Sequence, residues 1–111
     1  MSNNLKRKIS DRSALVGVFG LGYVGIPLSI AIAEAGFKVI GFDISVEKVA
    51  LINRGVSPLK HISNEKLKTK VTKKTLRACS NFKESEFCDI LIICVPTPLT
   101  KNKDPDLTFI Q

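Results

Sequence analysis

The sequence predicts an α/β fold whose parallel, doubly wound sheet has the strand order 3-2-1-4. Three observations carry this prediction. Residues 14–20 and 89–95 are almost continuously apolar, as strands are when both faces of a parallel sheet are covered. Residues 37–43 form a further apolar run behind a segment with helical spacing, so strand and helix alternate. The first run leads directly into the triplet G-x-G-x-x-G at 20–25, which is typical of a tight turn from a strand into a helix.

Local signals set the elements in the first half of the chain. The strand 14–20 is followed by a helix over 23–35, which tolerates Pro27 in its first turn and ends at Gly36. The second strand spans 37–43. Ser45 is a good N-cap, so we expect a helix from there to about residue 54, where a glycine follows.

The second half of the chain has weaker signals. After a loop at 56–62, Ser63 is expected to cap a short basic helix through about residue 74. Pro96 and Pro98 end the last strand, because neither can donate to a sheet ladder. The remaining elements, in chain order, are a weak third strand at 76–80, a short helical connection at 82–88, the fourth strand at 89–95 and a helix start at 104–106.

Length and composition limit the chain to one globular domain. With 111 residues, 44% hydrophobic and 24% charged, it can bury a single modest core. We expect a flexible N-terminal arm at 1–13, because this segment is polar, and the domain itself at 14–111. No apolar stretch reaches the ~20 residues that cross a bilayer, and no signal peptide is visible. Three cysteines without C-x-x-C spacing suit a reducing compartment, so we expect a cytoplasmic protein with no membrane partner.

The net charge of +7 is concentrated in two regions, the N-terminal arm and residues 54–83. The second region has nine Lys or Arg against one acid, Glu65. Clustered basic residues could attract nucleic-acid phosphates, or they could form a solvated helix face. No aromatic residues interleave with the lysines, and no known reading module is present, so a nucleic-acid partner is not expected.

The glycine triplet has the spacing of a Rossmann-type dinucleotide fingerprint, and each glycine has its own task. Gly20 allows the tight turn, Gly22 lets the backbone approach a pyrophosphate, and Gly25 lets the helix pack closely on the strand. The amides at the helix N-terminus can then bind the diphosphate without a lysine. The absence of Gly-Lys-Ser/Thr argues against a P-loop.

Asp43 ends the second apolar run, eighteen residues beyond Gly25. A carboxylate there is placed to accept hydrogen bonds from both hydroxyls of an adenosine ribose, and its charge repels a 2′-phosphate, so NAD is favoured over NADP. The alternative is a helix-capping Asp and turn glycines in an α/β fold that binds nothing. Thr97 follows the fourth strand, at the point where the strand order reverses, so its hydroxyl could reach the ribose or nicotinamide half of a dinucleotide; otherwise it caps a turn.

Three segments carry a resemblance to a known family. The stretches at 20–28 (GLGYVGIPL), 35–43 (AGFKVIGFD) and 94–99 (CVPTPL) resemble the nucleotide-sugar dehydrogenases that oxidise UDP-glucose, GDP-mannose and related sugars. Residues 57–62 and 100–107 are most similar to the branch that acts on UDP-N-acetylglucosamine or UDP-N-acetylmannosamine.

The resemblance implies an enzyme of polysaccharide biosynthesis that oxidises the sugar C6 alcohol to a carboxylate and reduces two NAD. Its NAD contacts would be the backbone of Tyr23 and Val24, Asp43 on the ribose, Lys48 one turn later, and Thr97. Lys48 could equally be a solvated helix lysine. A UDP-sugar is then the expected substrate, and a homo-oligomer the expected assembly.

The family's second oxidation uses a thiol nucleophile with lysine and asparagine partners, which the resemblance puts beyond the residues of this chain. Cys79, Cys88 and Cys94 fall outside that motif, so we expect neither catalytic nor metal-binding residues here. The chain then resembles an incomplete NAD-binding Rossmann domain, the N-terminal part of a larger enzyme that is inactive alone. A fourth strand without its neighbour would leave an uncovered apolar edge. The alternative is a non-catalytic module that senses a dinucleotide.

Overall fold

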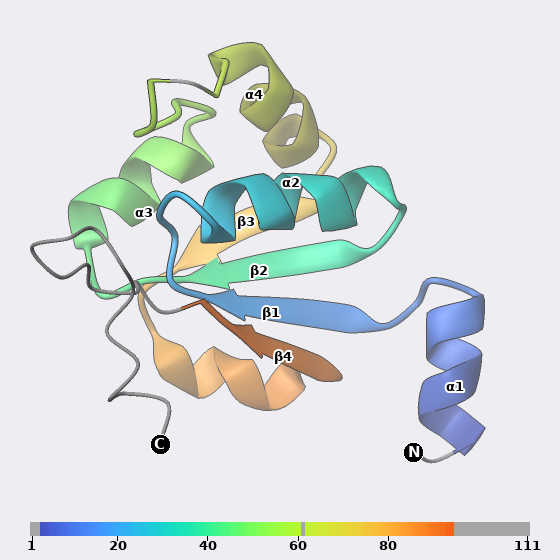
Figure 1. Cartoon of the computed structure of the whole chain (residues 1–111). Helices are drawn as coiled ribbons and strands as arrows, with labels where there is room; N and C mark the ends of the chain where they lie inside the picture. Colours follow the sequence, from blue (N-terminus) through green and yellow to red (C-terminus); the bar gives the residue numbers. More distant parts are fainter. Residues whose placement is uncertain (1–2, 61, 95–111) are drawn as a thin grey trace, which may run out of the picture.

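A four-stranded parallel sheet is the centre of the molecule (Figure 1). The computed structural model describes residues 3–60 and 62–94. The strand order is β3-β2-β1-β4, and each neighbouring pair is parallel, as the sequence predicted. The strands are β1 (Leu15–Phe19), β2 (Lys38–Phe42), β3 (Leu76–Cys79) and β4 (Ile90–Ile93).

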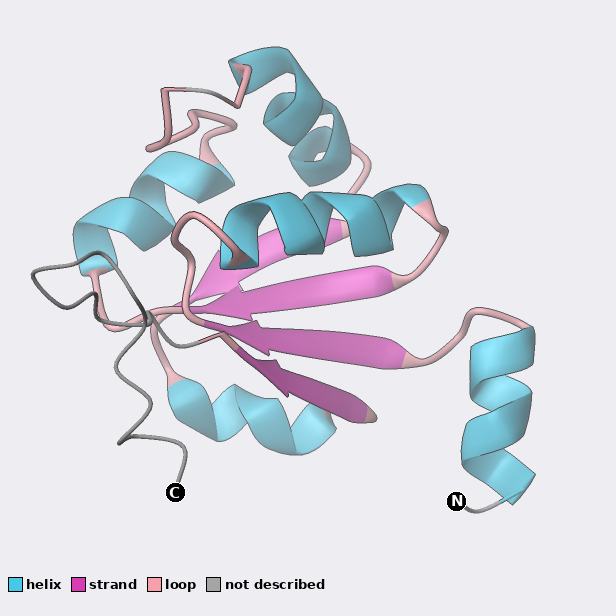
Figure 2. Ribbon diagram, in the orientation of Figure 1, coloured by secondary structure: helices cyan, strands magenta, loops and turns pink. Residues whose placement is uncertain are grey.

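The helices that follow β1 lie in two layers on the faces of this sheet, and α1 (Asn3–Ser10) lies beyond the start of β1 (Figure 2). One face is covered by α2 (Gly25–Glu34), α3 (Val46–Asn53) and α4 (Asn64–Thr72). The other face is covered by the 3-10 helix η1 (Phe82–Phe87), which takes the place of the predicted helical connection. The larger core lies on the α2 face, and a smaller one around Phe42 lies on the other.

The helix ends follow the signals in the sequence. Ser45 and Ser63 cap α3 and α4, because their hydroxyls accept hydrogen bonds from the amides of Lys48 (3.2 Å) and Lys66 (3.3 Å). Gly36 follows α2 with a φ of 102°, a left-handed conformation that ends the helix at little steric cost.

The N-terminal arm is the clearest difference from the prediction. The helix α1 (Asn3–Ser10) occupies most of a segment that was expected to be disordered. Lys8 donates to Asp89 at 2.9 Å, and Ile9 lines a hollow that residues of β1, β4 and α2 also line. The segment is thus tied to the domain by an ion pair that no local pattern reveals. The division of the chain into an arm at 1–13 and a domain from residue 14 stays a prediction.

The fourth strand is shorter than expected and only half covered. Leu91 and Ile93 are 49% and 71% exposed, while Ile90 and Ile92 pack against the larger core. Of the strands that the structure describes, β1 alone pairs with β4, so the other edge of β4 has no partner among the described strands. Residues 95–111, with Thr97, the two prolines and the predicted helix start, lie outside the described residues. Within the part that the structure describes, no helix has both the length and the apolar character needed to cross a bilayer.

The opposite edge of the sheet is closed by a side chain. Asn53, the last residue of α3, donates to the carbonyl oxygen of Ala78 at 2.9 Å and accepts from its amide at 2.8 Å. Its carboxamide therefore pairs with β3 as the backbone of a fifth strand would.

Candidate dinucleotide-binding site

The candidate site lies where β1 and β2 end side by side. The loop from Gly20 to Val24 joins β1 to α2, and the loop from Asp43 to Ser45 joins β2 to α3. The amide of Gly20 donates to the carbonyl oxygen of Phe42 at 2.8 Å, which holds the two loops together at their start. In a parallel sheet the carboxyl ends of the strands are where ligands bind.

The three glycines of the first loop have the geometry that their expected roles require. Gly20 has a φ of 95°, the left-handed conformation that a tight turn out of a strand needs. A Cβ atom on Gly25 would collide with the carbonyl oxygen of Gly20, so the helix packs closer to the strand than any other residue allows. A Cβ on Gly22 would meet nothing within 4 Å. The loop therefore leaves open space at the middle glycine alone.

The N-terminus of α2 faces this loop without a side chain of its own to cap it. Its N-cap is Val24, which makes no side-chain hydrogen bond, and the first turn contains no acidic residue. An uncapped helix start carries a partial positive charge and amides without intrahelical acceptors. This arrangement suits an anionic group such as a diphosphate.

Asp43 joins the two loops through both of its carboxylate oxygens. Oδ2 accepts from the amide of Leu21 and Oδ1 from the amide of Ser45, each at 2.9 Å. The Nζ of Lys48 lies 3.6 Å from Oδ2, so the structure brings together the acid and the lysine that the sequence singled out. Burial raises the pKa of the Asp43 carboxyl, but the two amide hydrogen bonds and the charge of Lys48 outweigh it, and the pKa lies below its ordinary value. The carboxylate is therefore ionised at neutral pH.

Large apolar side chains are exposed on both loops. Tyr23 is 77% exposed, Val24 65% and Ile44 84%. Exposed apolar residues beside a polar cradle fit a ligand that has both a charged and a flat apolar part.

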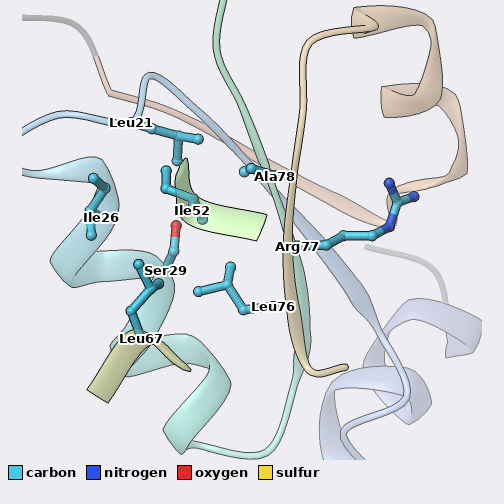
Figure 3. A pocket seen from close by; sticks show the side chains of 9 residues that line it. Leu21, Ile26, Ser29, Ile52, Leu67, Leu76, Arg77 and Ala78 are labelled. Atoms are coloured by element: carbon cyan, nitrogen blue, oxygen red, sulfur yellow. The ribbon is translucent and has the colours of Figure 1, made fainter. Parts of the chain in front are cut away.

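Sequence reasoning missed two residues that shape the site, Leu21 and Gly41. Leu21 was considered only as a variable position in the glycine motif, yet its side chain is 2% exposed and inserts into the core (Figure 3). Gly41 lies in β2 directly beneath it. Two features of the sequence could have revealed them. The second position of the glycine motif is apolar, and the following strand contains a glycine in its interior. Glycine weakens a strand there, so its presence indicates that another group approaches closely.

The cavity in Figure 3 is part of the core and not the site. It has a volume of about 10 Å³ and is lined mainly by Leu21, Ile26, Ile52 and Leu67. Ser29 also lines it, but its hydroxyl already donates to the carbonyl oxygen of Gly25 at 2.7 Å. The cavity is therefore too small and too apolar for a ligand.

Neither Cys79 nor Cys88 has the environment of an activated thiol. Cys79 is buried, and burial together with the hydrogen bond to Glu84 raises the pKa of its thiol; burial also raises the pKa of Cys88. A raised pKa keeps a thiol protonated and weakly nucleophilic. Among residues 3–60 and 62–94 no group of three His, Cys, Asp or Glu side chains could hold a metal ion.

The comparison with known families decides what this site belongs to. Residues 14–111 match the model of the "UDP-glucose/GDP-mannose dehydrogenase family, NAD binding domain". The chain belongs to this family. The matched residues thus belong to the NAD-binding domain of the nucleotide-sugar 6-dehydrogenases, and NAD is the cofactor. The predictions of family, of a Rossmann-type fold and of NAD are confirmed.

Individual family members show the same relationship. GDP-mannose 6-dehydrogenase of Pseudomonas syringae pv. syringae is 39% identical over 98 residues, which cover 86% of this chain and 22% of the relative. UDP-N-acetyl-D-glucosamine 6-dehydrogenase of Pseudomonas aeruginosa is 37% identical over 95 residues, which cover 84% and 21%. The structure of a ternary complex of GDP-mannose dehydrogenase from Pseudomonas aeruginosa superposes with a TM-score of 0.73 at 37% identity, over 86% of this chain and 22% of that one.

These comparisons also limit what is known of this family member. The chain spans about a fifth of the length of these two curated relatives. Relatives named for GDP-mannose and for UDP-N-acetyl-D-glucosamine are similar to it at nearly equal identity, 39% and 37%, so identity does not select a sugar.

Proposed function

We propose that this family member binds NAD across the ends of β1 and β2, with the diphosphate on the glycine loop and the adenosine ribose on Asp43. The observation that carries the proposal is the hydrogen bond between Asp43 Oδ2 and the amide of Leu21, beside the open space at Gly22. This bond joins the ribose-binding acid to the phosphate-binding loop, so both parts of one dinucleotide meet a single rigid unit.

Each residue has a distinct task in the proposed complex. The amides of Tyr23 and Val24 and the positive end of α2 hold the diphosphate, Gly20 and Gly25 keep the loop tight, and Lys48 adds positive charge beside Asp43. Thr97 is proposed to contact the nicotinamide half, on the grounds of sequence alone. When bound, NAD supplies a hydride acceptor. The chain's own residues bind and orient it and exclude a 2′-phosphate by charge.

The test of the ribose assignment is a calorimetric titration of NAD and NADP into the wild-type chain and Asp43→Asn. Asparagine removes the charge and presents a donor to one of the two amides, so NAD binding should weaken by roughly ten- to a hundredfold while the preference over NADP shrinks. Glu47→Gln is the matched control, since it removes a nearby carboxylate from the exposed start of α3. Unchanged NAD affinity in folded Asp43→Asn, or a wild-type preference for NADP, would overturn the assignment.

We propose further that the domain serves oxidation of an N-acetylated UDP-hexosamine at C6. The similarity of 57–62 and 100–107 to that branch supports this choice. The protein translated from the gene's whole reading frame should reduce NAD with UDP-N-acetylglucosamine or UDP-N-acetylmannosamine faster than with UDP-glucose or GDP-mannose. The opposite preference would leave the family assignment intact and overturn the sugar. NAD binding without turnover of any of the four would favour a dinucleotide-sensing module instead.

A further inference from the structure

We propose that the contact between the Leu21 side chain and the bare backbone of Gly41 positions the glycine loop and Asp43 for NAD. Leu21 and Gly41 would then be positioning residues. Both are buried in the core, so they act on NAD only through the loop and Asp43. The inference rests on the proposed NAD site and adds to it the part of the core that holds the site in place.

Leu21 is fixed at both its backbone and its side chain. Its amide donates to Asp43 Oδ2 at 2.9 Å, and its side chain, 2% exposed, lies among Ile26 of α2 and Ile52 of α3 (Figure 3). A displacement of this side chain therefore moves the residue between the first two glycines of the loop and disturbs the acid bonded to it.

Gly41 is the residue that makes room for Leu21. It lies in β2 opposite Val18 of β1, on the face that α2 covers. A Cβ atom there would lie 2.5 Å from Cδ2, 3.1 Å from Cδ1 and 3.3 Å from Cγ of Leu21. Its φ is outside the left-handed range, so the backbone itself does not require glycine. Glycine is needed at position 41 because it leaves space for the Leu21 side chain.

The cavity that adjoins Leu21 is too small to accept its side chain in a shifted position. The adjoining cavity has a volume of about 10 Å³. A single water needs about 10–15 Å³ by the same measure, and a shifted isobutyl group needs more. An added methyl group on β2 must therefore displace Leu21 toward the loop, or force β2 away from α2.

Gly41→Ala is the direct test, with NAD affinity measured by calorimetry at a temperature where the variant is folded. We expect NAD binding to weaken about tenfold, and the preference for NAD over NADP to shrink because Asp43 is displaced. Gly17→Ala is the matched control. It adds the same methyl to the neighbouring strand but on the other face, where its Cβ would lie 2.8 Å from Leu91 Cδ2 and 2.9 Å from Cys88 Sγ. It should cost stability with less than twofold change in NAD affinity.

A double-mutant cycle isolates the contact itself. Leu21→Ala removes the three carbon atoms that the methyl group added by Gly41→Ala would strike, so Gly41→Ala should change NAD affinity by less than twofold in that background. An equal loss of NAD affinity in both backgrounds, or an equal loss from Gly17→Ala, overturns the positioning role.

If Gly41→Ala does not fold, the NAD affinity of Leu21→Val is compared with that of Ile52→Val. The second variant shortens a side chain of α3 that lines the same cavity. Equal NAD affinities of those two variants would also overturn it. A wild-type chain that binds no NAD would instead refute the proposed function.

Discussion

At the scale of single residues, the three glycines of the loop satisfy three different steric requirements. Gly20 is needed for its left-handed backbone, and Gly25 because the carbonyl oxygen of Gly20 occupies the place of its side chain. Gly22 has neither constraint, since open space surrounds it. The fold does not require glycine at position 22, whereas the proposed NAD site does, so a substitution there should separate binding from stability.

Gly22→Val and Gly25→Val should therefore have different effects. Valine at 22 should abolish NAD binding and change the free energy of unfolding by no more than about 0.5 kcal/mol, as for a surface substitution. Valine at 25 should lower the free energy of unfolding by about 3 kcal/mol or more, because the backbone must move to admit it. Urea unfolding and calorimetry on both variants measure the two effects. A larger stability loss at 22 than at 25 would contradict these roles.

Asp43 should contribute stability that depends on pH in a defined direction. Its folded-state pKa lies below the ordinary value of 3.8, so its ionised form stabilises the fold at every pH above that value. This contribution is lost as the pH falls through the folded-state pKa. The difference in unfolding free energy between wild type and Asp43→Asn should thus be constant from about pH 8 to 5 and shrink below about pH 4. A difference that grows on acidification would contradict the assignment.

At the scale of secondary structure, the predictable elements were those with a local signal. The continuous apolar runs predicted β1, β2 and β4. Ser45 and Ser63 predicted the starts of α3 and α4. Both kinds of signal lie within a few neighbouring residues. The helix α1 was missed because the contacts that order it lie far along the chain, such as that between Lys8 and Asp89. The contact of Leu21 with Gly41 was missed for the same reason.

The pairing of Asn53 with β3 gives a prediction for the edge of the sheet. Asn53→Ala leaves the amide and carbonyl of Ala78 without partners, and Ala78 is only 5% exposed. We expect the free energy of unfolding to fall by about 2 kcal/mol or more. Asn53→Asp keeps the acceptor and loses the donor, so its loss should be intermediate. Hydrogen exchange at the Ala78 amide should accelerate in Asn53→Ala and remain slower in Asn53→Asp; equal exchange in wild type and Asn53→Ala would contradict the pairing.

At the scale of the whole molecule, NAD should stabilise the chain because the proposed site joins two of its loops. A ligand at a hundred times its Kd adds about 2.7 kcal/mol, which should raise the melting temperature by at least about 10 °C. NADP at the same concentration should raise it less. Equal shifts would show that the Asp43 carboxylate does not discriminate between the two nucleotides.

The chain of 111 residues should not turn over a nucleotide sugar. The chain spans about a fifth of the length of the relatives in the preceding comparison, and the thiols of Cys79 and Cys88 have raised pKa values that make them poor nucleophiles. The purified chain with NAD and UDP-N-acetylglucosamine should therefore produce no NADH. NADH production above that of a Gly22→Val control would refute this expectation.

The side chain of Asn53 also makes the two edges of the sheet unequal as sites for an added strand. A strand from any source, whether a peptide, a neighbouring molecule or more of the same chain, finds the amide and carbonyl of Ala78 already occupied at the β3 edge, while the outer edge of β4 pairs with no described strand. If strands add only at β4, two molecules can join through their β4 edges, and the occupied groups of Ala78 oppose further addition at β3. For protein engineering, we therefore expect lysine in place of Leu91 or Ile93 to oppose strand addition at β4.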